Sequence, residues 1–332
     1  MSVLSGIYPY ENTIISIEDG RLLNQLQYDV LFGARDLRAA LGELNAMDYF
    51  RSYVNAGTDN YGQMLDGLMN STFELMRAVS PDELVWRIFA LYYDIHNMKL
   101  VAKERAFHRR LGRLALSCGS YSLPTVRSAA VRESDDILEN RVLTEGFFMA
   151  LRAKDHHDID FILDKTYFKA LKDLAGRLRI PMIDAFVTER IDLYNISVYF
   201  QSAADGAPDS FFEKAFSDQG SVPLPEWQRH FENKDLDDAA GFGLWQKYRP
   251  LWGAGSAADK ARAHERLDVL IDNYLIEKTK VCKVMAFGIE PICAYFYNKL
   301  MEIKNVRIIL AGKRHAARTG EIRKWIRIPY EL

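Results

Sequence analysis

The chain has 332 residues, of which 48% are hydrophobic and 27% charged, with a formal net charge of −2. These values are ordinary for a soluble globular protein, and the length favours two or three domains. No apolar run approaches the ~20 residues of a membrane-spanning helix, and the N-terminus lacks the pattern of a signal peptide, so we expect a cytosolic protein. Three cysteines without metal-ligand spacing predict free thiols.

The first third of the chain is expected to be helical after a loosely held arm over residues 1–20. Ser80-Pro81-Asp82-Glu83 is a capping box that contains a proline, a good helix start. Apolar residues recur at helical spacing on both sides of this box. The predicted helices cover residues 21–32, 34–44, 64–79 and a stretch from 83 towards 113.

After a turn-rich boundary at residues 119–124, the rest of the chain is also predicted to be helical. Breaker residues at 203–208 and a loop at 220–225 interrupt it again. Strand-type alternation is scarce throughout, so the sequence predicts an all-α fold. The later predicted helices cover residues 128–138, 143–152, a stretch from 181, 265–283, 291–313 (between Pro291 and Gly312) and 321–326.

An internal repeat organises the chain. A proline precedes an acid-x-x-Asn pair three times, by thirteen, eleven and eleven residues. A tyrosine-containing stretch precedes each copy, at residues 44–51, 163–169 and, more weakly, 271–275. A period near one hundred residues predicts three similar helical domains, over residues 1–118, 119–206 and 207–332. The pairs are Asp94 and Asn97, Asp192 and Asn195, and Glu302 and Asn305.

Each pair lies three residues apart and therefore shares one helix face. A carboxylate accepts from arginine or backbone N–H groups, and an asparagine both donates and accepts. Because the pairs occupy the same place in a repeated helix, we interpret them as packing devices. A catalytic carboxylate set is the less favoured reading.

The sequence lacks the nucleotide-binding and catalytic motifs that were sought. Gly312-Lys313 fails the P-loop pattern, and no HExxH or Gly-x-Ser-x-Gly occurs. The cluster at residues 155–160 gathers His156, His157 and three aspartates. Adjacent histidines on a helix point about 100° apart, so a solvated face is favoured over a metal site. We therefore predict no catalytic residue, cofactor or metal.

Charge is distributed unevenly. Residues 299–332 hold nine Lys and Arg against three Asp and Glu, a local net charge of +6. A second basic run follows the first acid-x-x-Asn pair. Such runs can meet anionic lipid headgroups, nucleic acid or an acidic protein partner, although a solvated helix face is the simpler explanation. The candidate partner-contact residues are Arg105, Arg109, Arg110, Arg314 and Arg318.

The C-terminal part resembles a known family: the C subunit of archaeal and bacterial A/V-type ATPases, which is the counterpart of the d subunit of eukaryotic V-ATPases. Residues 287–313, FGIEPICAYFYNKLMEIKNVRIILAGK, carry most of the likeness. Residues 93–99, YDIHNMK, and 164–168, DKTYF, add to it. The resemblance spans residues 25–332 with gaps; residues 1–27 match poorly, and residues 220–223 only approximate the family's proline-glycine loop.

The resemblance implies a non-catalytic central-stalk subunit without cofactors. Family members form a funnel of three helical domains that joins the central shaft to the membrane rotor ring and transmits torque. The implied partners are the shaft subunits and the ring, on the cytoplasmic side of the membrane. Contact with the membrane surface is left open; nucleic acid and small-molecule substrates are not expected. The alternatives are an unrelated all-α repeat scaffold and an all-α metal-dependent enzyme.

Overall fold

The computed structural model describes residues 8–47, 61–132, 138–204, 209–232, 243–252 and 266–332. Over these ranges it consists of helices and turns without a β-strand, which confirms the predicted all-α class for this part of the chain. The chain forms two compact units. Unit 1 comprises Met1–Glu83 with Leu251–Leu332, and unit 2 comprises Leu84–Pro250.

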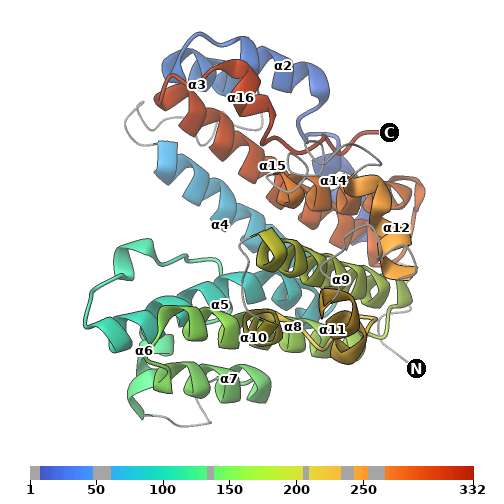
Figure 1. Ribbon diagram of the computed structural model, residues 1–332. Coiled ribbons are helices and arrows are strands. Elements are labelled where there is room, and N and C mark those ends of the chain that lie inside the picture. Colours follow the sequence, from blue (N-terminus) through green and yellow to red (C-terminus); the bar gives the residue numbers. More distant parts are fainter. Residues whose placement is uncertain (1–7, 48–60, 133–137, 205–208, 233–242, 253–265) are drawn as a thin grey trace. The chain divides into compact units, whose positions relative to one another are not determined.

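Unit 1 joins both ends of the sequence, as the blue and red segments of Figure 1 show. Its long C-terminal helix α15 packs against helices α1, α3, α4 and α14. The helices described in unit 1 are α1 (Pro9–Asp19), α2 (Gln25–Gly33), α3 (Leu37–Ala46), α4 (Tyr61–Val79), α14 (Leu267–Thr279), α15 (Glu290–Arg314), α16 (Thr319–Arg323) and the 3-10 helix η5 (Lys280–Val284).

The core of unit 1 forms around α15. Its apolar residues recur at spacings of three and four, so they line one stripe that becomes buried. This stripe meets side chains of α2, α3, α4 and α16, which join both ends of the chain in one core. The buried stripe consists of Ile303, Val306, Ile309 and Leu310.

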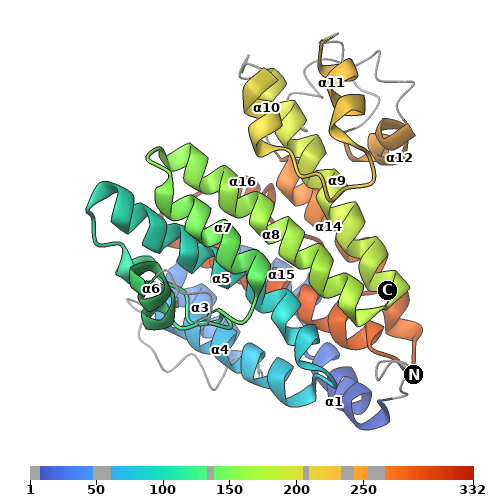
Figure 2. The ribbon, with the colours of Figure 1, turned by 90° about the horizontal axis from the view of Figure 1, so that it is seen from below.

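Unit 2 is built from the middle of the sequence, and Figure 2 shows α7 and α8 side by side. Helix α8 also packs against α9 and α10. Unit 2 begins at the second residue of α5 and ends two residues before the end of α12. Its described elements are α5 (Glu83–Phe107), the 3-10 helix η3 (Gly112–Leu114), α6 (Leu123–Arg132), α7 (Arg141–Arg152), α8 (His156–Leu178), α9 (Pro181–Ala204), α10 (Asp209–Ala215), α11 (Leu224–Glu232) and α12 (Gly243–Trp252).

Local chemistry sets several helix boundaries in unit 2. Asp155 caps α8 by accepting from the backbone N–H groups of His157 and Asp158. Helix α5 ends at Phe107, short of the predicted extension towards residue 113, because His108 adopts a left-handed conformation with φ 51°. The start of α9 at Pro181 agrees with the prediction.

The expectation of a loosely held arm over residues 1–20 is wrong for its described part. Residues Pro9–Asp19 form α1, which begins with a proline and buries Ile15. The Asn12 amide donates to the carbonyl oxygen of Gly288 at 2.8 Å, which ties α1 to the segment before α15. The polar sequence of residues 1–20 did not indicate this helix, because tertiary contacts rather than local sequence stabilise it.

Gly312 does not end α15, which continues to Arg314. A Cβ at Gly312 would lie 2.6 Å from the Ile322 side chain, so the glycine permits the close approach of α16. The predicted helix over residues 265–283 is split into α14 and η5, and the predicted helix over 321–326 is instead Thr319–Arg323. The part of the first tyrosine stretch beyond residue 47 lies outside the described residues.

Candidate functional site

The first acid-x-x-Asn pair lies fully buried in α5. Asn97 donates to the carbonyl oxygen of Leu116 at 2.7 Å and accepts from the N–H of the same residue at 3.0 Å. The Asp94 carboxylate accepts from the backbone N–H of Tyr121 at 3.0 Å. The pair therefore fixes the backbone that leads from α5 to α6.

The second pair repeats this arrangement in α9. Asn195 donates to the carbonyl oxygen of Ser217 and accepts from its N–H, both at 2.9 Å. Asp192 accepts from the backbone N–H of Ser221 at 2.7 Å and from its hydroxyl at 2.8 Å. Both side chains are buried, and they fix the segment that leads to α11.

The third pair, in α15, holds segments from both ends of the sequence. Asn305 donates to the carbonyl oxygen of Arg327 and accepts from its N–H, both at 2.9 Å. Glu302 accepts from the backbone N–H of Leu23 at 2.5 Å, just before α2. It also accepts from the ammonium group of Lys299, whose side chain is 1% exposed. The hydrogen bonds to Asp94 and Asp192 described above come instead from backbone N–H groups and the hydroxyl of Ser221.

Two glycines make room for the carboxylates of unit 2. A Cβ on Gly119 would lie 2.4 Å from Oδ1 of Asp94, and one on Gly220 would lie 2.7 Å from Oδ1 of Asp192. Contacts this short do not occur in folded proteins, so these positions require glycine while the carboxylates keep their places.

Burial dominates the electrostatics of the pairs. It raises the pKa of Asp94 to about 7, against the hydrogen bonds from Tyr121 and Ser120. It also raises the pKa of Asp192, against the hydrogen bonds from Ser221. The pKa of Lys299 is lowered by burial, and the charge of Glu302 opposes that shift. Removing charge from water is costly, so groups kept here need the partners just described.

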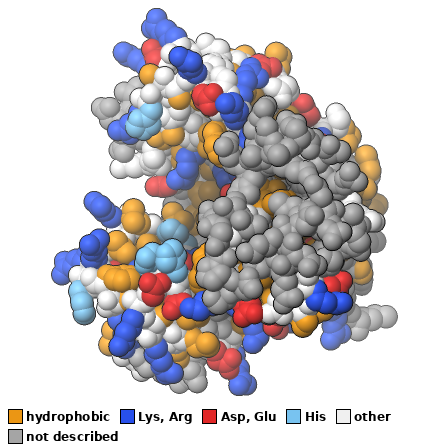
Figure 3. All heavy atoms as spheres, viewed as in Figure 1, with side chains coloured by type: hydrophobic (Ala, Val, Ile, Leu, Met, Phe, Trp, Pro, Cys, Tyr) orange, Lys and Arg blue, Asp and Glu red, His pale blue; other side chains and the backbone are white. Residues whose placement is uncertain are grey.

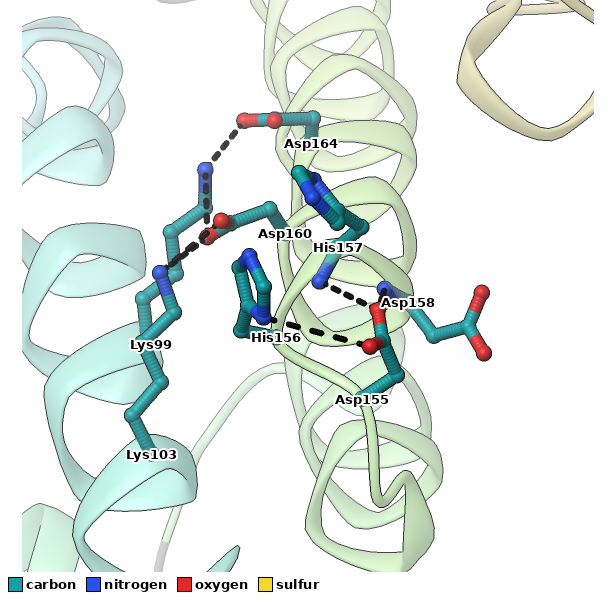
Figure 4. A network of polar contacts seen from close by, with 8 residues as sticks. All are labelled: Lys99, Lys103, Asp155, His156, His157, Asp158, Asp160 and Asp164. Carbon is teal, nitrogen blue, oxygen red and sulfur yellow. Dashed lines mark hydrogen bonds and ion pairs between the residues drawn. The ribbon is translucent and has the colours of Figure 1, made fainter. Parts of the chain in front are cut away.

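The acidic cluster at the start of α8 is joined to α5 by lysines (Figure 4). Lys99 lies 2.7 Å from Asp164, and Lys103 lies 2.8 Å from Asp160. His156 and His157 are exposed, with ring centroids 3.9 Å apart. Across the described residues, no group of three or more His, Cys, Asp or Glu is placed to hold a metal ion. The cluster thus makes ion pairs between helices.

The candidate partner-contact arginines lie in both units, and Figure 3 shows basic side chains interspersed with acidic ones on the face it presents. Arg105 donates to the carbonyl oxygen of Ala130 at 3.0 Å and so connects α5 with α6. Arg109 and Arg110 are exposed beyond the end of α5. Arg314 lies over the Tyr61 ring at 5.8 Å, and Arg318 is exposed just before α16.

Several partners of the pairs were absent from the sequence-based predictions. Glu302 and Asn305 form further hydrogen bonds with Leu23, Tyr28 and Lys299. Leu23 and Tyr28 are remote in sequence, so only the fold brings them to α15. A signal existed for the other two pairs: Gly-Ser-x-x-Leu-Pro occurs at residues 119–124 and 220–225. Its glycine and the backbone after it meet the carboxylate in both places.

No helix among the described residues has the length and apolar character to cross a membrane.

Comparison with known proteins gives a consistent result. The profile of a family described as ATP synthase (C/AC39) subunit matches residues 12–324. The C subunit of the V-type sodium ATPase of Enterococcus hirae is 24% identical over 316 residues, covering 88% of this chain and 90% of that protein. The C subunit of the A-type ATP synthase of Methanocaldococcus jannaschii is 22% identical over 344 residues, covering 95% of this chain and 85% of that protein.

Proposed function

This chain belongs to the ATP synthase (C/AC39) subunit family, a non-catalytic subunit of rotary ATPases, and on that premise we propose that it joins the central shaft to the membrane rotor ring and transmits torque between them. The relatives are named as C subunits of V-type and A-type enzymes. The chain is accordingly a component of such a complex and has the other subunits as partners.

The observation that carries the torque role is the recurrence of the buried pairs. In each of the long helices α5, α9 and α15, one asparagine binds both backbone groups of a single later residue. Buried, paired polar groups resist displacement because opening them leaves donors and acceptors unsatisfied. A body locked in this way suits a part that must pass on force without deforming.

We further propose that the three pairs mark three similar helical domains arranged as a funnel, over residues 1–118, 119–206 and 207–332. The pair of α5 holds Tyr121, which lies in the second copy, and the pair of α9 holds Ser221, which lies in the third. The pair of α15 holds Leu23, which lies in the first copy just before α2. This cyclic order of contacts supports a threefold internal repeat, and the acid-x-x-Asn residues are its structural motif.

The partners in this proposal are the shaft subunits and the rotor ring, reached from the cytoplasmic side. A contact that must not slip is broad and shape-matched, and its rim charges add orientation more than affinity. Arg109, Arg110 and Arg318 are exposed and suit such a rim. Because exposed pairs are screened over ~8 Å at physiological salt, salt should weaken assembly without abolishing it.

The role is tested by removing the chain from a complete complex. Membranes that contain the ATPase but lack this subunit should still hydrolyse ATP in the head and should lose ATP-driven ion transport, which returns when the tagged chain is added. Shaft and ring subunits should co-purify with it. Coupled transport without the chain, or a tagged chain that captures no ATPase subunit, contradicts the proposal.

The basic rim is tested separately by charge reversal. Arg109→Glu with Arg110→Glu, and Arg314→Glu with Arg318→Glu, are compared with Lys169→Glu, an exposed position on α8 outside both runs. At least one double variant should bind shaft or ring more weakly, with a shallower salt dependence. If both bind as the control does, these arginines are solvated and take no part in assembly.

A further inference from the structure

The segment over residues 105–132 contains six arginines and no aspartate or glutamate. It covers the end of α5, the loop that contains η3, and the whole of α6. The basic run near the C-terminus differs, because some of its side chains pair with acids, as Arg323 does with Asp29 and Lys324 with Glu321. A segment of one sign is available to attract a negative partner from outside the chain.

Internal contacts hold this segment in a fixed shape. Arg105 donates to the carbonyl oxygen of Ala130 at 3.0 Å, which joins the end of α5 to the end of α6. Glu104, which precedes the segment, accepts from Arg127 at 2.9 Å and from the backbone N–H of Leu111 at 2.6 Å. Two of the six arginines therefore position the backbone, and four remain for other contacts.

Those four arginines are exposed, and their side chains form no ion pair or hydrogen bond with another described residue. They are Arg109, Arg110, Arg113 and Arg132.

Exposed apolar side chains accompany these arginines. Phe107 ends α5 and is 40% exposed, Leu114 ends η3 and is 51% exposed, and Val131 in the last turn of α6 is 84% exposed. Figure 3 shows basic and hydrophobic side chains next to one another at its left edge, where α5 ends. The surface thus combines one sign of charge with separate apolar groups.

This combination matches the surface of an anionic bilayer. Arginine binds phosphate oxygens in a bidentate manner, and each basic residue near an anionic membrane adds to the attraction. Apolar side chains beside them can enter the boundary between headgroups and acyl chains, each without a complementary pocket. A contact between proteins would instead surround a packed apolar centre with polar groups of both kinds. The rotary ATPase to which the chain belongs is membrane-associated, so such a bilayer is near.

We propose that the surface formed by the end of α5, the loop after it and the end of α6 binds the phosphate groups of an anionic lipid bilayer. The four exposed arginines contact the headgroups, and Phe107 and Val131 enter the boundary beneath them. The inference goes beyond the proposed function and does not depend on the torque role, because Arg314 and Arg318 can supply the rim described above.

Vesicle binding by the full chain tests this. Phosphatidylcholine vesicles with and without an equal share of phosphatidylglycerol are mixed with the chain, and bound protein is measured by sedimentation across a salt series. The chain should bind the anionic vesicles and not the neutral ones, and salt should weaken binding. Arg109→Ala with Arg110→Ala should reduce the affinity by about tenfold or more.

A matched double variant controls for net charge. Lys169→Ala with Arg177→Ala removes the same charge from exposed positions of α8 and should leave the vesicle affinity nearly unchanged. Equal binding to both kinds of vesicle, or an equal loss in both double variants, overturns the proposal.

A fluorescent label locates the contact. An environment-sensitive dye is attached to Val131→Cys and, as the control, to Arg177→Cys, with the unsubstituted chain as the blank for native cysteines. Lys103 near the end of α5 pairs with Asp160 near the start of α8, so Arg177 lies at the distant end of α8. Anionic vesicles should shift the emission to shorter wavelength at position 131 alone. Equal shifts at both positions, or none, overturn the proposal.

Purified ATPase subunits separate a lipid from an acidic protein partner. If Arg109→Ala with Arg110→Ala weakens binding of shaft or ring subunits in solution but leaves vesicle binding intact, the surface binds an acidic protein and the proposal is wrong. Vesicle binding is measured on the chain alone, so a tagged chain that captures no ATPase subunit refutes the proposed function and not this inference.

Discussion

The pairs in α9 and α15 use the same residue pattern on very different chain segments. In α9 the pair binds Ser217 and Ser221, which follow it by 22 and 29 residues. In α15 the asparagine again binds a residue 22 positions later, whereas Glu302 binds Leu23, 279 positions earlier. The first arrangement orders a nearby connection; the second joins the two ends of the described chain in one unit.

The two arrangements also differ in charge. Asp192 accepts from neutral donors, the N–H and hydroxyl of Ser221. Glu302 accepts from a backbone N–H and from the buried ammonium of Lys299. Closing a long loop costs more chain entropy than closing a short one. The comparison teaches that the same motif can hold a remote segment when a charged partner is added to it.

Removal of the α15 carboxylate should have the largest effect. Glu302→Ala leaves the Lys299 ammonium buried without its partner, and breaking a buried pair in this way costs ~3–5 kcal/mol of unfolding free energy. Urea denaturation of the purified chain measures the loss. Lys299→Met combined with Glu302→Ala removes both charges and should recover much of it; a double variant as unstable as the single one contradicts this reading.

Removing the carboxylates of α5 and α9, which accept from uncharged donors, should lower the unfolding free energy less than removing Glu302 does. Asp192→Ala and Asp94→Ala each leave a backbone N–H without its acceptor, for a loss of ~1–3 kcal/mol. Thermal unfolding of the single variants provides the comparison with Glu302→Ala. Unchanged melting temperatures in all three would mean that the pairs do not hold the fold, and a functional role for them would have to be reconsidered.

Adding a methyl group beside a buried carboxylate should lower the unfolding free energy by no more than removing that carboxylate does. Gly119→Ala forces a methyl group against Asp94, and overpacking of this kind costs ~1–3 kcal/mol. Gly176→Ala is the control, because nothing lies within 4 Å of a Cβ there and the site is inside α8, where alanine favours the helix. Equal stability of the two variants would show that the Asp94 site is not tightly packed.

The smallest effect concerns pH. The pKa of Asp94 is raised to about 7 in the folded chain from an ordinary value near 3.8. Between these values the unfolded chain loses a proton that the folded chain keeps, so this group lowers stability as the pH rises from about 4 to 7. Asp94→Asn, which keeps an oxygen acceptor, should flatten that part of the stability–pH curve. An unaltered curve in denaturation series contradicts the shift.

The sequence by itself determined the helical class and the acid-x-x-Asn pattern. Helical periodicity and proline positions are local properties, so they could be read without knowing what each helix meets. The likeness of residues 287–313 to the ATPase C subunits also lay in the sequence alone, and the family match across residues 12–324 confirms it. The spacing of three placed each acid and asparagine on one face, as the hydrogen bonds of α5, α9 and α15 require.

Only the tertiary structure decided what those faces touch. Asp94 is buried because the segment after α5 folds back over it. Helix α1, the placement of Gly312 inside α15 and the bond from Leu23 to Glu302 likewise depend on residues remote in sequence. Periodicity records which side of a helix is covered, but the identity of the covering backbone is set by packing between segments that share no local pattern.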